Sequence, residues 1–382
     1  MIDTQEALDA LTDQLEKQDV LAIDCEMDSM YAYGTSLCVV QIGWEDKEAL
    51  LDGLVELDRS RLGALFVDAR KVKVFHGGEN DIGLMRSQWG FDFSNTFDTM
   101  AASQILGHKG VGLAAALERH FEVQISKKYQ KADWRIRPLP KDQADYARID
   151  VRYLIALREC LLDELEELGR VEEAESEFER IARANITDKP FDPDNWVRVK
   201  GGKQLPNEAR GLLREIYVAR DSISKRLDRA PYRVLHDSAI VELAKRRPET
   251  EGQCKDVRGV SRNLSPKDVQ LLLNAVQRGV ESGEIPLPAH KGRRKIWEHK
   301  EDSKLTAEQE ALFESLRKWR VKRAADRGVD VARVATTSLL MLIAGAQPKT
   351  PRELAAVKGM EPWRQREYGD ELLAVVCEKK TS

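Results

Sequence analysis

The chain has 382 residues, of which 42% are hydrophobic and 33% charged, a composition typical of a globular protein with apolar cores. This length predicts two or three domains. No apolar run approaches the ~20 residues needed to cross a bilayer, and the acidic N-terminus lacks the features of a signal peptide. The five cysteines are scattered without a C-x-x-C pair, so neither a disulfide framework nor a zinc site is expected. We therefore expect a cytoplasmic protein that does not contact a membrane, and we expect it to be a monomer.

The net charge of −4 conceals two halves of opposite sign. Residues 1–200 carry 25 Lys and Arg against 39 Asp and Glu, whereas residues 201–382 carry 36 against 26. An acidic half suits a metal-dependent catalytic domain, and a basic half suits contact with a polyanion. The alternative is that both halves are solvated surfaces over which charge is unevenly distributed.

Strand-like and helix-like runs alternate along residues 1–160. We predict strands at VLAIDCEM, SLCVVQIGW, EALLDGL and KVKVFH, where apolar and β-branched residues are concentrated. We predict helices, from apolar residues at helical spacing, at RLGALFVDA, NDIGLMRSQWG, FDTMAASQIL, VGLAAALERHF and QADYARIDVRYLIALRECLLDELEELG. This order predicts an α/β domain with a mixed sheet.

The chain changes character near residue 186. The segment ITDKPFDPDNWVRVKGGKQLPNE contains three prolines and two glycines, which is typical of a connection between domains. Beyond it the chain reads as wholly helical, apart from a second break at GEIPLPAHKGRRKIWEHKEDSK. The basic run Lys291-Gly292-Arg293-Arg294-Lys295 in this second break could bind RNA or be only solvated.

The two helical blocks are related by an ungapped offset of 100 residues. The matching pairs include Arg220 and Arg320, Arg233 and Arg333, Ser238 and Ser338, Ala244 and Ala344, Pro248 and Pro348, and Gly259 and Gly359. This spacing is too long for a solenoid unit and predicts a duplicated small helical domain. The expected domains are an α/β domain 1–185, a linker 186–206, a helical domain 207–285, a basic linker 286–304 and a second helical domain 305–382.

Four acidic residues lie at the edges of apolar runs, where a strand or helix can direct them into a cleft: Asp24, Glu26, Asp81 and Asp150. Asp24 and Glu26 are two residues apart, so a strand places both on one face. Tyr146 and Asp150 are four apart, so a helix places both on one face. Carboxylate oxygens that converge on one point suit a pair of divalent cations, the usual means of cleaving phosphodiester bonds.

These motifs, in this order, resemble the DEDD superfamily of 3′→5′ exonucleases, the subgroup with a tyrosine in its third motif, and within it the ribonuclease D family. The two helical repeats resemble HRDC domains, which RecQ helicases share with ribonuclease D. The resemblance extends over nearly the whole chain. It rests on Ile23-Asp24-Cys25-Glu26 with Leu37-Cys38-Val39-Val40-Gln41-Ile42, Val74-Phe75-His76 before Asp81, Phe97-Asp98-Thr99, Lys127 with Gln130, Asp133 and Trp134, and Tyr146 with Asp150.

The resemblance implies a ribonuclease H-like fold and a two-metal-ion 3′→5′ exoribonuclease. It implies that two Mg²⁺ or Mn²⁺ ions are held by four carboxylates: those of Asp24, Glu26, Asp81 and Asp150. Tyr146 would orient the attacking water, because an unperturbed pKa near ~10 makes a phenol a poor general base at neutral pH. The substrates would be the 3′ ends of tRNA precursors and other structured RNA, and the products nucleoside 5′-monophosphates.

Four further residues are candidate substrate contacts: His76, Lys127, Lys128 and Gln130. Structural interpretations compete with some of these roles. His76 ends a strand, where a local hydrogen bond is the commoner role, and Lys127 with Lys128 could be a solvated loop as readily as a phosphate contact. We expect Asp98 to be a helix N-cap rather than a metal ligand, and Trp134 to be a packed anchor rather than a stacking partner for a base.

Two alternatives for the whole protein remain open from the sequence. The same acids serve DNA exonucleases, and only contacts to the ribose 2′-hydroxyl separate the two classes of enzyme. A non-catalytic RNA-binding protein with a degenerate site is the other alternative. It is disfavoured because all four acids and the tyrosine are present.

Overall fold

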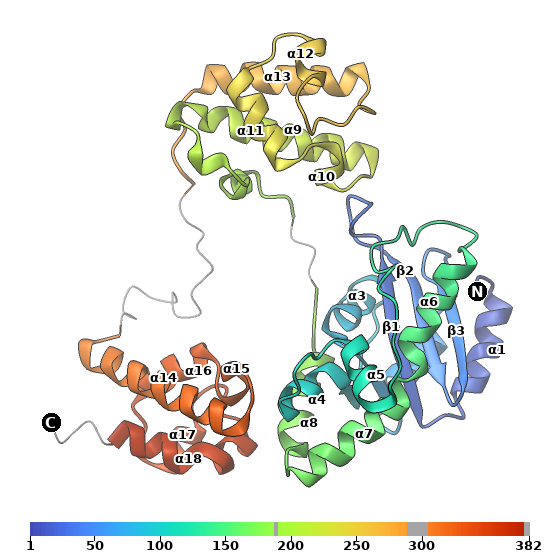
Figure 1. The fold of residues 1–382 in the computed structure, drawn as a ribbon, viewed down its shortest axis with the longest axis vertical. Helices are drawn as coiled ribbons and strands as arrows, with labels where there is room; N and C mark the ends of the chain where they lie inside the picture. Colours follow the sequence, from blue (N-terminus) through green and yellow to red (C-terminus); the bar gives the residue numbers. More distant parts are fainter. Residues whose placement is uncertain (187–189, 289–304, 378–382) are drawn as a thin grey trace.

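An α/β domain is followed by two helical domains in the computed structural model, which describes residues 1–186, 190–288 and 305–377 (Figure 1). This confirms the predicted fold class of a mixed-sheet domain followed by an all-helical region. Within the described ranges, none of the helices is both long and apolar enough to span a membrane. The basic run at 291–295 lies outside the described residues.

The sheet has five strands, and β1 (Val20–Met27) is its central strand. On one side of β1 lie β2 (Leu37–Trp44) and then β3 (Lys47–Asp52), each antiparallel to its neighbour. On the other side lie β4 (Val72–Phe75) and then β5 (Thr96–Asp98), each parallel to its neighbour. The sheet is therefore mixed, as predicted. Because β1 is central, both of its edges are paired with neighbouring strands.

Within residues 1–186, eight helices surround this sheet: α1 (Gln5–Leu15), α2 (Ser60–Val67), α3 (Glu79–Trp89), α4 (Thr99–Leu106), α5 (Leu113–Phe121), α6 (Lys141–Arg152), α7 (Leu154–Glu167) and α8 (Val171–Ala182). Two of the predicted helices were too long. Phe97 and Asp98 form the end of β5 instead, and α4 begins only at Thr99, where Asp98 caps it. The long helix predicted through Tyr153 is two helices that meet at that residue.

Helix α6 crosses the face of the sheet formed by β1, β2 and β3. The crossing is close, because a Cβ added at Gly43 of β2 would lie 3.3 Å from atoms of Val151 on α6. A glycine at this position therefore sets how near α6 can lie to the sheet. Leu21, Ile23 and Cys25 of β1 belong to the main apolar core, while the intervening side chains of the strand point to the opposite face.

The two helical domains repeat one another element by element. The first comprises α9 (Arg210–Leu227), α10 (Pro231–Val234), α11 (Asp237–Arg246), α12 (Glu251–Lys255) and α13 (Pro266–Ser282). The second comprises α14 (Ala307–Arg327), α15 (Val331–Val334), α16 (Thr337–Ala346), α17 (Pro351–Ala355) and α18 (Pro362–Cys377). The three middle helices keep the offset of 100, and left-handed residues recur at the same places, as at Gly259 and Gly359. Each repeat has its own apolar core, so the predicted duplication is confirmed.

The segment predicted as a linker is built onto the first helical domain. It forms short 3₁₀ helices, η1 (Pro193–Arg198), η2 (Gly202–Gln204) and η3 (Asn207–Ala209). Trp196 and Val199 are buried in the core of that domain. The proline-rich composition therefore marks an ordered extension of the helical domain over these residues.

Candidate active site

Three of the four predicted acids come together on one face of the sheet. Ligand oxygens of Asp24, Glu26 and Asp150 lie within 4.8 Å of one another. Asp24 and Glu26 are two residues apart on β1, so both side chains lie on the face that α6 crosses. Asp150 lies on α6 next to them. Residues separated by more than 120 positions in the sequence thus form one carboxylate cluster.

Asp81 completes the predicted set from another element. It lies in the first turn of α3 and is buried. It is not part of the group of three, but its charge adds to burial in raising the pKa values of Glu26 and Cys25, and burial, followed by the charge of Asp24, raises its own pKa. Asp81 therefore lies beside the cluster, close enough to share an electrostatic field with it.

A glycine turn held by Asp98 leads into the helix that carries Asp81. Gly77 has a φ of +73°, a conformation that favours glycine. One carboxylate oxygen of Asp98 accepts hydrogen bonds from the N–H groups of Gly77 (3.1 Å) and Ala101 (2.8 Å), and the other accepts from Gly78 (2.8 Å). Asp98 is thus the predicted N-cap of α4. It also fixes the turn before Asp81, a role that the sequence did not reveal.

The buried acids raise one another's pKa values. Burial raises the pKa of Asp24 to about 7 and that of Asp150 to about 8, with the charge of Asp24 adding to the second shift. Burial, followed by the charges of Asp24, Asp150 and Asp81, raises the pKa of Glu26 to about 10. Protein alone therefore disfavours full ionisation, whereas a bound cation would favour it. Clustered hard oxygen donors suit a divalent ion such as Mg²⁺ or Mn²⁺, so the residues fit the predicted metals.

Gln41 is a polar residue of this site that sequence reasoning did not single out. It lies directly opposite Asp24 in the β1–β2 register, and opposite residues of antiparallel strands share a face. Its side chain is fully buried, and neither amide atom has a hydrogen-bond partner in the described structure. A buried amide normally has a partner. A glutamine inside the apolar run LCVVQI was the available signal.

Tyr146 lies one helical turn before Asp150 on α6, as predicted. Burial raises the pKa of its phenol, and the charges of Asp150, Glu26 and Asp24 raise it further. The hydroxyl therefore keeps its proton at neutral pH and can donate or orient a hydrogen bond, but it cannot serve as a base there.

The ring of Tyr146 packs against two aromatic side chains. The ring centroid of Tyr129 is 6.0 Å away and that of Trp134 is 6.1 Å away. Trp134 is only 1% exposed, which confirms it as a packed anchor and leaves no face for stacking on a base. Both residues belong to the segment 127–137, which packs against α6.

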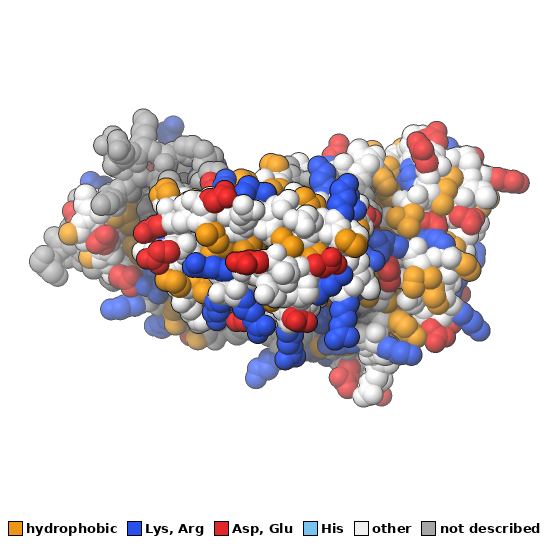
Figure 2. Space-filling view, turned by 90° about the horizontal axis from the view of Figure 1, so that it is seen from above, with side chains coloured by type: hydrophobic (Ala, Val, Ile, Leu, Met, Phe, Trp, Pro, Cys, Tyr) orange, Lys and Arg blue, Asp and Glu red, His pale blue; other side chains and the backbone are white. Residues whose placement is uncertain are grey.

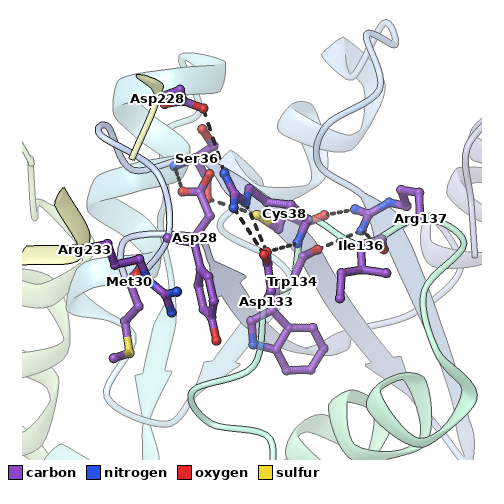
Figure 3. Close-up of polar contacts among 12 residues, drawn as sticks. Asp28, Met30, Ser36, Cys38, Asp133, Trp134, Ile136, Arg137, Asp228 and Arg233 are labelled. Carbon is purple, nitrogen blue, oxygen red and sulfur yellow. Dashed lines mark hydrogen bonds and ion pairs between the residues drawn. The ribbon is translucent and has the colours of Figure 1, made fainter. Parts of the chain in front are cut away.

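Arg137 fastens this segment to the sheet (Figure 3). Its guanidinium donates to both carboxylate oxygens of Asp52, at 2.5 and 2.7 Å, and to the carbonyl oxygen of Cys38 at 2.7 Å. A bidentate pair of this kind is geometrically specific. The aromatic side chains beside Tyr146 are therefore supported from β2 and from the end of β3.

The predicted substrate contacts fall into two groups. Lys127, Lys128 and Gln130 are exposed, so they are accessible to a substrate, and their role stays a prediction. The Nδ1 atom of His76 lies 2.9 Å from the hydroxyl oxygen of Thr99, and burial lowers the histidine pKa to about 4. His76 is therefore neutral at physiological pH and makes the local hydrogen bond expected of a residue at a strand end.

Comparison with protein families defines the class. Residues 1–166 match the 3′-5′ exonuclease family, and residues 209–276 and 309–376 each match the HRDC domain family. The carboxylate cluster lies within the first match. The fold and the site thus define a 3′-5′ exonuclease followed by two HRDC domains.

Individual relatives identify the family. The chain is 31% identical to ribonuclease D of Granulibacter bethesdensis, over 75% of this chain and 73% of that protein, and 28% identical to ribonuclease D of Zymomonas mobilis, over 98% and 93%. It is also 28% identical to the Saccharomyces cerevisiae exosome complex exonuclease RRP6, over 72% of this chain but only 40% of that longer protein. The crystal structure of Escherichia coli RNase D shares the fold, with a TM-score of 0.61 and 20% identity over 99% of this chain and 98% of that one. The chain belongs to the ribonuclease D family of 3′-5′ exoribonucleases.

Proposed function

We propose that this protein removes nucleotides one at a time from the 3′ ends of structured RNA, tRNA precursors among them, and releases nucleoside 5′-monophosphates. The observation that carries this proposal is the carboxylate cluster of Asp24, Glu26 and Asp150 on the face of β1 below Tyr146. Membership of the ribonuclease D family supports RNA as the substrate.

Asp24, Glu26, Asp81 and Asp150 would hold two divalent ions, Mg²⁺ or Mn²⁺. When bound, such ions supply a nucleophilic water at neutral pH and neutralise charge on the phosphate that is cleaved. Buried carboxylates with raised pKa values are well suited to this task, because a cation relieves the repulsion among them.

The protein's own contribution is to position groups and hold protons. Tyr146 keeps its proton at neutral pH, so its hydroxyl can hold the attacking water or a phosphate oxygen in line. Tyr129 and Trp134 limit how far the ring of Tyr146 can move. The exposed residues Lys127 and Lys128 would attract the phosphate backbone.

The helical half supports binding of longer RNA. Figure 2, seen from above the view of Figure 1, shows Lys and Arg side chains gathered mainly along the lower edge of this face, with Asp and Glu side chains among them. Arg258, Arg262 and Lys267, near the junction of α12 and α13, are exposed and have no acidic partner among the described residues. Unpaired surface cations of this kind bind phosphates in a salt-dependent manner.

A direct experiment compares RNA and DNA of the same sequence, each labelled at its 3′-terminal nucleotide, in the presence of Mg²⁺. We expect Mg²⁺-dependent release of labelled nucleoside 5′-monophosphate from the RNA, and none from the Asp24→Asn variant. Equal release from DNA would favour the DNA exonuclease alternative. Absence of release from both substrates would leave the RNA-binding alternative.

Three finer statements accompany this proposal. We propose the domain limits 1–185, 207–285 and 305–382, joined by the connections 186–206 and 286–304, the first of which packs Trp196 and Val199 into the first helical domain. We propose that the protein acts as a monomer. We propose that it works in the cytoplasm, which suits five cysteines that are all free thiols.

A further inference from the structure

The loop that follows the catalytic strand is covered by the first HRDC domain. Residues 28–36 connect β1, which carries Asp24 and Glu26, to β2. The Tyr33 hydroxyl donates to Asp221 of α9 at 2.7 Å, and the N–H of Ala230 donates to the carbonyl oxygen of Tyr31 at 3.0 Å. The first HRDC domain therefore binds a segment that begins two residues after a predicted metal ligand.

Arg233 makes the central contact with this loop. Its Nε donates to the carbonyl oxygen of Met30 at 2.7 Å, and its guanidinium carbon lies 3.9 Å from the centroid of the Tyr31 ring. The hydroxyl of Tyr232 donates to the same Met30 carbonyl at 2.7 Å. A guanidinium that both stacks and hydrogen-bonds fixes its partner in distance and in orientation.

Tyr31 connects this contact to the segment beside Tyr146. Its hydroxyl donates to the carbonyl oxygen of Lys131 at 2.7 Å. Lys131 lies between Tyr129 and Trp134, the two residues whose rings flank Tyr146. One series of direct contacts thus leads from Arg233 of the HRDC domain through Tyr31 to the segment that holds the catalytic tyrosine.

Charged groups beside these contacts involve the same three parts of the chain: the loop 28–36, the segment 127–137 and the first HRDC domain (Figure 3). Arg135 pairs with Asp133 at 3.1 Å and lies 3.9 Å from the carboxylate of Asp228 in the HRDC domain. Asp28 accepts a hydrogen bond from the N–H of Ser36 at 2.6 Å and thereby closes the loop on itself. The loop is therefore a compact unit, so that a contact at Tyr31 acts on the whole of it.

The second repeat offers an internal comparison. Arg333 occupies the position equivalent to Arg233, and it too contacts the exonuclease domain, but there it pairs with Glu177 of α8 at 3.0 Å and with Gln104 of α4. Neither of those partners belongs to the loop 28–36 or to the segment beside Tyr146. The same surface of the repeat therefore docks twice on the exonuclease domain. The first docking reaches the loop 28–36 and the segment beside Tyr146, whereas Glu177 at the second also pairs with Arg180, which pairs with Glu79 in the first turn of α3.

The scaffold behind both arginines is the same. Arg220 donates to the carbonyl oxygen of Leu235 and Arg320 to that of Ala335, in each case the residue that follows the short helix bearing the docking arginine. The two docking surfaces are thus built alike, which makes a substitution in one repeat a matched control for the other.

We propose that Arg233 and Tyr31 are positioning residues for RNA hydrolysis: docking of the first HRDC domain holds the loop 28–36 and, through Lys131, the aromatic side chains that orient Tyr146. This inference rests on the proposed exoribonuclease function. In this view the first HRDC domain contributes to the chemical step even on an RNA too short to reach it. The second HRDC domain, which docks on α4 and α8, does not hold these aromatic side chains.

The test uses the full-length protein and a short single-stranded oligoribonucleotide with Mg²⁺. Arg233→Ala is expected to lower kcat by about tenfold or more with little change in KM, because misplacement of a supporting group costs turnover rather than substrate binding. The matched variant Arg333→Ala is expected to keep the kcat of the unaltered protein. Hydrogen exchange should show reduced protection at residues 28–36 and 129–134 in Arg233→Ala only.

The variant Tyr31→Phe separates the hydrogen bond to Lys131 from the docking of the first HRDC domain. It retains the ring under Arg233 and removes only the hydrogen bond to Lys131, so kcat should fall while the exchange of residues 230–233 stays unchanged. Wild-type kcat in Arg233→Ala, or an equal loss in Arg233→Ala and Arg333→Ala, would overturn the inference. Failure of the unaltered protein to cleave RNA would instead contradict the proposed function itself.

Discussion

The carboxylate of Asp98 accepts a hydrogen bond from the N–H of Gly78 at 2.8 Å, and this bond joins the start of α4 to the turn that carries Asp81. Replacing Asp98 by Ala removes a helix cap and leaves the buried N–H of Gly78 without its acceptor. We expect a loss of about 2–4 kcal/mol in the free energy of unfolding, measured with urea. Asp98→Asn retains one acceptor oxygen and should lose less. Equal stability of all three proteins would contradict this structural role.

Asp24 is expected to be essential for turnover, since it belongs to the group of three carboxylates and interacts with Asp81. Asp24→Asn keeps the shape of the side chain and removes its charge. We expect kcat to fall by roughly a thousandfold, equal to about 4 kcal/mol of transition-state stabilisation. Isothermal titration of Mn²⁺ should show weaker binding in the same variant. Unaltered metal affinity would assign Asp24 another role.

Tyr146 is expected to act through its hydroxyl alone, because its ring packs against Tyr129 and Trp134. Tyr146→Phe should therefore preserve stability and Mn²⁺ affinity. Turnover is expected to fall by about a hundredfold, as for the loss of one group that orients a proton or a water. Single-turnover measurement of nucleotide release is the suitable assay. A rate equal to that of the unaltered enzyme would show that the hydroxyl has no part in the reaction.

The metal-free protein should lose stability as the pH rises. An Asp carboxyl in an unfolded chain titrates near ~3.9, whereas burial raises the folded-state pKa of Asp24 to about 7 and that of Asp150 to about 8. The folded protein therefore retains protons that the unfolded chain has released. Its stability is greatest below the unfolded pKa and declines as the pH rises through the folded values.

Two measurements check this dependence. Without metal, the thermal midpoint is expected to decrease as the pH rises from about 4 to about 8, because the folded cluster holds its protons more tightly than the unfolded chain. Added Mg²⁺ should raise the midpoint more at the upper end of that pH range. The double variant Asp24→Asn, Asp150→Asn should have a flatter pH profile and a smaller response to Mg²⁺. A Mg²⁺ effect of the same size in this variant would place the bound ion elsewhere.

Substitution of three exposed cations tests whether the first HRDC domain binds RNA: Arg258, Arg262 and Lys267. Their combined replacement by Ala should weaken binding of long RNA and reduce the slope of log Kd against log salt by up to about 3, one for each phosphate that the variant no longer neutralises. Cleavage of a short oligoribonucleotide should keep its kcat, since the docking residue Arg233 is untouched. An unchanged salt slope would show that these side chains are only solvated.

Much of this protein could be predicted from its sequence, because each prediction rested on local periodicity or on a register. The alternation along β1 placed Asp24 and Glu26 on one face, and helical spacing placed Tyr146 above Asp150. The offset of 100 residues predicted the second helical domain, since homologous side chains keep their spacing when no residue is inserted. Capping by Asp98 was also predicted, because that interaction spans only a few residues.

Only the tertiary structure decided which distant residues meet. That Gln41 lies opposite Asp24 depends on the register of two strands. That Arg233 docks on Tyr31, whereas the matching Arg333 docks on Glu177, depends on where each repeat packs against the exonuclease domain. Identical repeat positions carry no information about this choice, because contacts between domains arise from packing and shape complementarity rather than from any periodicity along the chain.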